Sequence, residues 1–122
     1  MALEETNTVD YIEMSLMDNK VLIVTIFDDY YDYKNVDRSE EEHLYLLENK
    51  INSCCAYIIS KQYKEKYPNK TFEKFIVQIK FTYKISNECY NLLIEAKKAL
   101  KKYNIDIIAR YFKYRRKYFF EK

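Results

Sequence analysis

The stretch KVLIVTIF, residues 20–27, decides the fold. Nearly all of its residues are β-branched or aromatic, which predicts a central strand covered on both faces. Before it, residues 10–17 alternate apolar and polar side chains, the pattern of a half-buried strand. Asp18-Asn19 lies between the two and suits a tight turn, because both residues tolerate positive φ. The chain is therefore expected to begin its sheet with a hairpin.

A long acidic connection follows this strand. It reads FDDYYDYKNVDRSEEEH (residues 27–43) and holds seven acids, two bases and three tyrosines, whereas connections in compact domains have a median of about 4–6 residues. Ser39 and Glu42 have the spacing of a capping box and predict the start of a helix that ends before Pro68. One apolar stripe at spacings of three and four supports this helix: Leu44, Leu47, Ile51, Cys54 or Cys55, and Ile58.

The rest of the chain repeats the alternation of strand and helix. Residues 75–83 alternate as a strand, Ser86 or Asn87 can cap a second helix, and residues 105–120 predict a long last strand. We therefore predict one α+β domain over residues 1–122, with a flexible N-terminal segment 1–9. Its four-stranded, mainly antiparallel sheet would carry two helices on one face, in the order ββαβαβ. The inner face of the second helix would consist of Leu92, Leu93, Ala96, Leu100 and Tyr103.

The composition narrows the setting and the classes of function. The chain has no glycine, so it lacks a phosphate-binding loop and a nucleophile elbow, and left-handed positions are expected at Asn19, Asn69 and Asn104. No apolar run approaches the roughly 18–20 residues of a membrane span, and the N-terminus has no signal-peptide pattern. Three cysteines without a CxxC pair fit reduced thiols. We expect a cytoplasmic protein with no membrane partner.

The net charge of +2 conceals two halves of opposite sign. Residues 1–43 contain 12 acids and three bases, a net charge of −9, whereas residues 44–122 contain seven acids and 18 bases, a net charge of +11. Such asymmetry points to an interaction surface. The alternative is that the two halves pack together and neutralise one another.

Catalytic and metal chemistry have little support in the sequence. His43 is the only histidine, and Glu40 at i−3 could share a metal with it, but most transition-metal sites need three or four ligands. Cys54 and Cys55 lie about three helical turns from His43, too far for a nucleophile and its base. We expect no enzyme activity, catalytic residue, cofactor or metal.

Two segments carry a resemblance to a known family. LEETNTVDYI (residues 3–12) and EHLYLLENKINSCCAYI (residues 42–58), followed by Tyr67-Pro68, resemble an uncharacterised family of small bacterial α+β proteins, a domain of unknown function. Its start reads E-x-T-x-V-D-x-I and its helix E-H-L-x-L-L-x-x-K-I-N. The chain departs from this pattern in its longer acidic connection and its basic, aromatic end. In size, glycine poverty and acidic loop it is also similar to immunity proteins of contact-dependent growth inhibition toxin systems.

The acidic connection is the candidate binding surface. Carboxylates steer a basic partner, and tyrosines supply buried contact area. A basic toxin domain, for example a nuclease, is such a partner, while a plain solvated loop is the alternative. The candidate residues are Asp28, Asp29, Tyr30, Tyr31, Asp32, Tyr33, Asp37, Glu40 and Glu41.

A second candidate surface lies in the basic, aromatic end RYFKYRRKYFFEK (residues 110–122). Cations for phosphates and rings for stacking are what single-stranded nucleic-acid platforms use. The alternative is a soluble edge strand protected by its charges. The basic residues are Arg110, Lys113, Arg115, Arg116 and Lys117.

Overall fold

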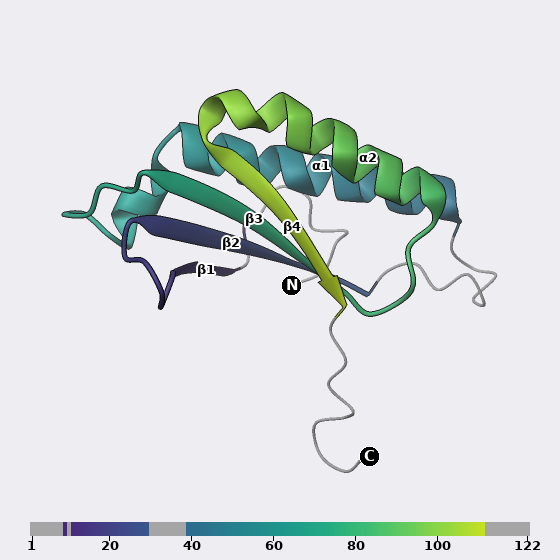
Figure 1. Ribbon diagram of the computed structural model, residues 1–122, viewed down its shortest axis with the longest axis horizontal. Coiled ribbons are helices and arrows are strands. Elements are labelled where there is room, and N and C mark those ends of the chain that lie inside the picture. Colours follow the sequence, from purple (N-terminus) through teal and green to yellow (C-terminus); the bar gives the residue numbers. More distant parts are fainter. Residues whose placement is uncertain (1–8, 10, 30–38, 112–122) are drawn as a thin grey trace, which may run out of the picture.

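In the described part of the chain, two α-helices cover one face of a four-stranded sheet (Figure 1). The computed structural model describes residues 9, 11–29 and 39–111. The elements confirm the α+β class and the ββαβαβ order. They are β1 (Tyr11–Met14), β2 (Val21–Asp28), α1 (Glu40–Ile59), the 3-10 helix η1 (Gln62–Glu65), β3 (Lys74–Phe81), α2 (Asn87–Leu100), the 3-10 helix η2 (Lys101–Tyr103) and β4 (Ile105–Tyr111).

The sheet is mixed and mostly parallel, so the prediction of a mainly antiparallel sheet is wrong. Its order is β1-β2-β3-β4, with β1 antiparallel to β2 but β2 parallel to β3 and β3 parallel to β4. The reason lies in the connections. A helix that returns the chain to the same edge of a sheet makes the next strand parallel, and a right-handed crossover is strongly preferred. Two such crossovers in the same direction place both helices on one face.

Side-chain caps set the start of each helix. Ser39 accepts a hydrogen bond from the N–H of Glu42 at 3.1 Å, and Ser86 accepts one from the N–H of Cys89 at 3.1 Å. Both caps were predicted, with Ser86 rather than Asn87 as the second. Asn104 has φ 61°, as expected, and ends η2.

The other left-handed position was not predicted. Among the described residues, positive φ occurs at Lys61 and Asn104, so the prediction is wrong for Asn19 and Asn69. Lys61 follows the end of α1, and its N–H donates to the carbonyl of Ile58 at 3.1 Å. This reversal starts η1 and brings Tyr63 into the core.

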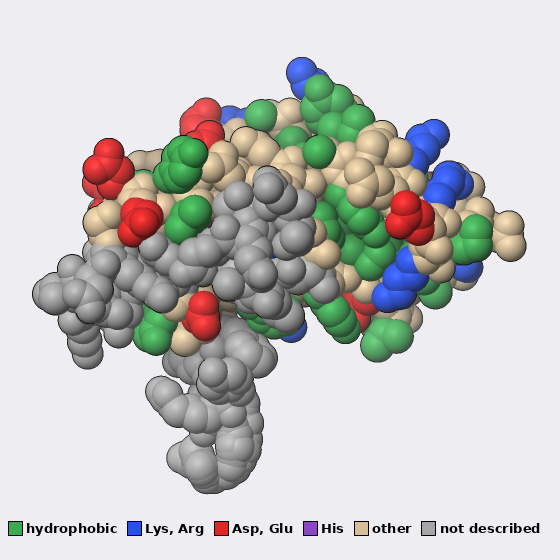
Figure 2. Space-filling model, turned by 180° about the vertical axis from the view of Figure 1, so that it is seen from behind, with side chains coloured by type: hydrophobic (Ala, Val, Ile, Leu, Met, Phe, Trp, Pro, Cys, Tyr) green, Lys and Arg blue, Asp and Glu red, His purple; other side chains and the backbone are tan. Residues whose placement is uncertain are grey.

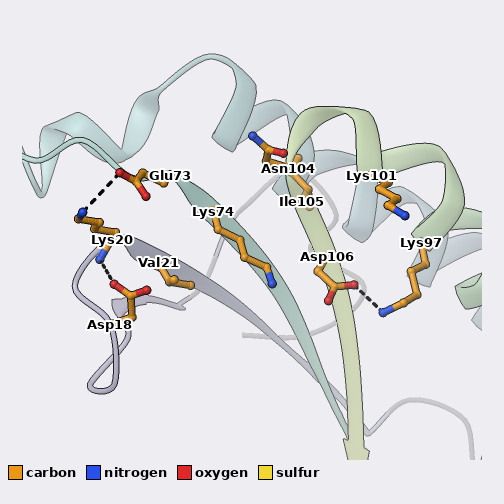
Figure 3. Close-up of a pocket in the computed structure, with 10 residues that line it drawn as sticks. All are labelled: Asp18, Lys20, Val21, Glu73, Lys74, Lys97, Lys101, Asn104, Ile105 and Asp106. Carbon is orange, nitrogen blue, oxygen red and sulfur yellow. Dashed lines mark hydrogen bonds and ion pairs between the residues drawn. The ribbon is translucent and has the colours of Figure 1, made fainter.

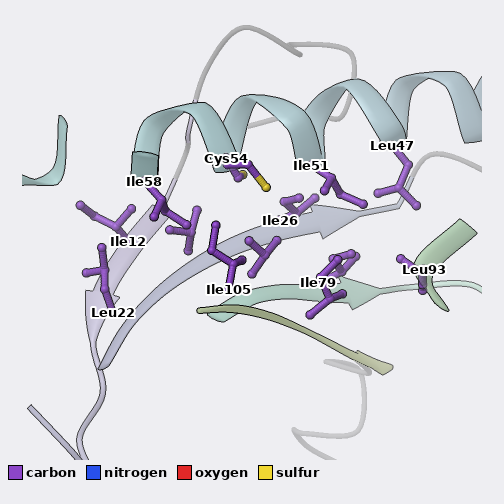
Figure 4. Packing of buried hydrophobic residues seen from close by; sticks show 14 of the residues in the cluster. Ile12, Leu22, Ile26, Leu47, Ile51, Cys54, Ile58, Ile79, Leu93 and Ile105 are labelled. Carbon is purple, nitrogen blue, oxygen red and sulfur yellow. The ribbon is translucent and has the colours of Figure 1, made fainter. Parts of the chain in front are cut away.

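The core lies between the helices and the covered face of the sheet (Figure 4). The predicted stripe of α1 faces inward and packs against β2 and β3. α2 contributes Leu93 fully and Leu92, Ala96 and Leu100 partly, but Tyr103 is 46% exposed and was wrongly predicted to face inward. The buried members of the stripe are Leu47, Ile51, Cys54, Cys55 and Ile58.

The ends of the chain are described only in part. Of the predicted flexible segment 1–9, Val9 is described and packs against the core, while residues 1–8 lie outside the described part. Residues 112–120 of the predicted last strand also lie outside it. Among the described helices, none has the length and apolar character to cross a membrane.

The outer edge of β4 is protected by its own side chains. Asn104 directs its carbonyl to Phe75 of β3, so by alternation Ile107 directs its backbone groups away from β3. The carboxylate of Asp106 accepts the N–H of Ile107 at 2.8 Å, and the ammonium of Lys97 donates to the Ile107 carbonyl at 3.2 Å. Lys97 also pairs with Asp106. A lysine over an edge strand opposes pairing with another chain.

We predict that Lys97→Met increases self-association, because it keeps the apolar stem and removes the ammonium that occupies the Ile107 carbonyl. Lys98→Met is the matched control, since Lys98 is exposed and pairs with Glu95 of its own helix. Light scattering after size exclusion would give the mass of both variants over a concentration series. An unchanged mass for Lys97→Met relative to the parent protein would contradict the protective role.

Candidate functional site

The carboxyl ends of β2, β3 and β4 and the N-termini of both helices meet at one end of the molecule (Figure 1). This follows from the two crossovers, since each helix begins just beyond the strand that precedes it. In open α/β sheets, ligands bind preferentially beyond the carboxyl ends of the strands. The acidic connection leaves the described part at Asp29 and re-enters it at Ser39, and both residues lie at this end.

A buried Asp28–His43 pair joins the end of β2 to the start of α1. The Nε2 of His43 lies 2.6 Å from the Oδ2 of Asp28, and the two side chains are 4% and 2% exposed. An ionised carboxylate only accepts hydrogen bonds, so with Asp28 charged the shared proton lies on Nε2. Separately, the backbone N–H of His43 donates to the carbonyl of Ser39 at 3.1 Å, within the first turn of the helix.

This pair changes the interpretation of Asp28. The sequence placed Asp28 outside the strands, as the first carboxylate of the binding surface. The structure places it as the last residue of β2, with 3% of its surface exposed. Its carboxylate is therefore a structural group that holds α1 against the sheet. His43, in the first turn of α1, is the other member of this structural contact.

Cys89 adds a thiol to the same interior cluster. It lies in the first turn of α2 and is fully buried. Burial raises the pKa of this thiol to about 12, and the charges of Asp28 and Glu40 act in the same direction. The sequence offered no reason to place Cys89 near Asp28. A thiol with so high a pKa stays protonated at neutral pH and is a poor nucleophile.

The exposed carboxylates surround this cluster. Among the predicted binding residues, Asp29 and Glu41 are exposed and Glu40 is half-buried. Glu42 and Glu88 are also exposed at this end, in the first turns of α1 and α2. The remaining predicted members lie outside the described residues: Tyr30, Tyr31, Asp32, Tyr33 and Asp37. The acidic end is the name used below for Asp29, Glu40, Glu41, Glu42 and Glu88.

The opposite end of the molecule is basic. Figure 2 shows most of the acidic side chains toward the left, where the helices begin, and a group of basic ones toward the right. Lysines cluster around the C-termini of both helices and the turn after α1. An excess of exposed acids thus lies at one end of the described part and an excess of lysines at the other, where Lys20, Lys97 and Lys98 pair with Glu73, Asp106 and Glu95. The basic end comprises Lys20, Lys61, Lys64, Lys66, Lys70, Lys74, Lys97, Lys98, Lys101 and Lys102.

A family model covers residues 1–113 of the chain. The chain belongs to DUF6572, a family of unknown function. Comparison with curated proteins and with solved structures gives no match. Membership in DUF6572 agrees with the expectation of an uncharacterised family.

Lys50 is a feature of this DUF6572 protein that sequence reasoning missed. It is 1% exposed although it lies in the middle of α1. The signal was available, because Lys50 follows Leu47 by three residues and precedes Cys54 by four, so it falls on the buried stripe.

Within residues 9, 11–29 and 39–111, no three His, Cys, Asp or Glu side chains converge as metal ligands.

We predict that Asp28→Ala lowers the free energy of unfolding by about 3 kcal/mol, because it leaves the buried ring of His43 without its acceptor. The neighbouring Asp29→Ala is the control. Its side chain is exposed, so a change within about 0.5 kcal/mol is expected. Urea unfolding followed by circular dichroism measures both. Equal effects of the two substitutions would show that the Asp28–His43 pair does not hold β2 to α1.

We also predict that the cysteines resist alkylation in the folded protein. All three are buried, and burial raises the pKa of Cys55 to about 11 as it does that of Cys89 to about 12. The thiolate is the reactive form. Because of the raised pKa values, only a very small fraction of each thiol is thiolate at pH 8. Iodoacetamide at pH 8, followed by intact-mass analysis, should leave Cys55 and Cys89 unmodified, while the same treatment in urea should modify every cysteine. Rapid labelling of Cys89 in the folded protein would contradict its burial.

Proposed function

We propose that this protein is a non-enzymatic binding protein that neutralises a basic protein partner through its acidic end. The partner class that fits best is a toxin domain with a basic surface, such as a nuclease, and the protein would act as its immunity protein in the cytoplasm. The observation that carries the proposal is the separation of charge. Exposed carboxylates gather where both helices begin, at the end from which the acidic connection leaves the sheet.

The geometry supports binding in two ways. Clustered carboxylates attract a basic surface over a distance and raise the rate of association. The support beneath them is fixed, because the Asp28–His43 pair ties the end of β2 to the first turns of α1. A surface that is already ordered loses less entropy on binding than a flexible one. Tyr30, Tyr31 and Tyr33 would add contact area beside Asp29, Asp32 and Asp37.

The second proposal is a nucleic-acid-binding module that uses the basic, aromatic end of the chain. Of its basic residues, Arg110 lies within the described part. Its side chain is exposed, but its Nε donates to Gln78 across the sheet at 3.0 Å. Because the guanidinium already forms a hydrogen bond within the protein, it gives the second proposal little support. Binding to RNA is therefore the rival outcome in the experiment below.

The test removes three charges at a time from two places. The variant Asp29→Asn, Glu41→Gln, Glu88→Gln removes exposed carboxylates of the acidic end. The control Glu48→Gln, Glu65→Gln, Glu95→Gln removes three exposed carboxylates elsewhere and changes the net charge equally. The product of the adjacent reading frame serves as the probe, by survival on co-expression and by association kinetics. We expect association to slow about tenfold at low salt for the acidic-end variant, with the control near the parent rate.

Three results would contradict this function. Full protection by the acidic-end variant would show that binding uses another surface. Equal loss in both variants would show that only net charge matters. Sub-micromolar binding to single-stranded RNA, falling steeply with salt, would favour the nucleic-acid module.

A further inference from the structure

The connection between β1 and β2 holds two apolar side chains fully in solvent. Leu16 is 101% exposed and Met17 is 94% exposed. The sequence predicted Leu16 to be buried on a strand that reached Met17, but β1 ends at Met14. Single exposed apolar residues are common, whereas two adjacent ones at the tip of a connection form a projecting apolar surface.

The backbone at this tip is held by hydrogen bonds on both sides. The Met17 N–H donates to the hydroxyl of Ser15 at 3.2 Å, and the Lys20 N–H donates to the carboxylate of Asp18 at 2.9 Å. The Val21 N–H also donates to the Asp18 carbonyl at 3.1 Å. A defined turn therefore holds Leu16 and Met17 in solvent.

A basic cavity of about 600 Å³ lies beside this tip (Figure 3). Asp18 and Lys20 of the same connection line it, together with Lys74, Lys97 and Lys101. Lys20 pairs with Glu73, and Lys97 pairs with Asp106. The hydrogen bond from Lys97 lowers the pKa of Asp106, and the charge of Lys74 lowers it further by a smaller amount. The cavity contains four lysines and three acids, so it retains a positive charge.

More lysines extend the positive charge along the neighbouring surface. The Lys66 ammonium donates to the carbonyl of Ile12 in β1 at 3.2 Å, which ties the turn after α1 to the hairpin strand. Lys61 and Lys64 are exposed on the same turn. The apolar tip thus belongs to the basic end defined above and lies opposite the acidic end.

We propose that the basic end docks on an anionic lipid bilayer, with Leu16 and Met17 inserted below the headgroups and the lysines on the lipid phosphates. An anionic bilayer provides an apolar layer directly beneath a layer of negative charge, and surface-binding proteins use both. Single-stranded nucleic acid also provides phosphates, but it stacks its bases on aromatic rings, whereas the side chains that project from this tip are the aliphatic Leu16 and Met17. The expectation of no membrane partner rested on the lack of a spanning segment, and surface docking needs none. This inference is independent of the partner at the acidic end.

The experiment is co-sedimentation of the full chain with vesicles of phosphatidylcholine, with and without about one third phosphatidylserine. We expect the protein to bind the anionic vesicles at low salt and to bind them several-fold more weakly at higher salt. Binding to the neutral vesicles should be weaker by about tenfold or more. Leu16→Ser, Met17→Ser should reduce binding to anionic vesicles about tenfold. Tyr45→Ser, which removes an exposed ring on α1, should leave it unchanged.

A second pair of variants tests the role of charge. The double variant Lys74→Ala, Lys101→Ala removes two lysines of the basic end, and Lys84→Ala is the control, because Lys84 is exposed beyond the other end of β3. Only the first variant should lose binding. Three outcomes would overturn the proposal: no binding to anionic vesicles, binding that does not depend on Leu16 and Met17, or competition by inorganic phosphate at the lipid-phosphate concentration, which would indicate a small-anion site. Tighter binding to single-stranded RNA than to vesicles would assign the basic end to nucleic acid instead.

Discussion

The two consecutive crossovers, β2–α1–β3 and β3–α2–β4, constrain everything else in this structure. Each must be right-handed for the chain to pack back on a twisted sheet. Because both run in the same direction across the sheet, both helices lie on one face and both begin at the same end. A helix favours negative charge at its N-terminus and positive charge at its C-terminus. The topology therefore favours acids at the end where both helices begin and bases at the end where they finish.

The Asp28–His43 pair depends on this arrangement and strengthens it. Asp28 ends β2 and Glu40 begins α1, and the two meet because α1 must run back antiparallel to β2 for β3 to pair parallel with it. A buried carboxylate is costly unless it is hydrogen-bonded, so the pair favours one docking of α1 on β2 over its alternatives. The exposed carboxylates of the acidic end are placed by the same contact. A structural interaction in the interior thus positions the surface that we propose binds a partner.

Local signals in the sequence predicted the parts of the fold that depend on neighbours. The caps at Ser39, Ser86 and Asn104 and the apolar stripe of α1 need only residues three or four positions apart. The direction of strand pairing depends on the path of a whole helix, and the antiparallel prediction overlooked it. The Asp28–His43 contact joins residues that 15 positions separate, and no periodicity reports such a pair. For the site, the sequence predicted exposed acids at Asp29 and Glu41 but could not distinguish them from the buried Asp28, since all three belong to one acidic stretch.

On the face of the sheet away from the helices, polar side chains of neighbouring strands bond to one another. Gln78 of β3 donates to the hydroxyl of Thr25 in β2 at 3.2 Å and accepts from Arg110 of β4 at 3.0 Å, so one chain of hydrogen bonds crosses three strands. Beside it, the Lys80 ammonium lies 5.6 Å from the ring centre of Phe27, a cation–π contact. Polar groups engaged with one another in this way are less available to a ligand. The physical argument for binding therefore rests on the two charged ends of the molecule, where the crossovers concentrate unlike signs.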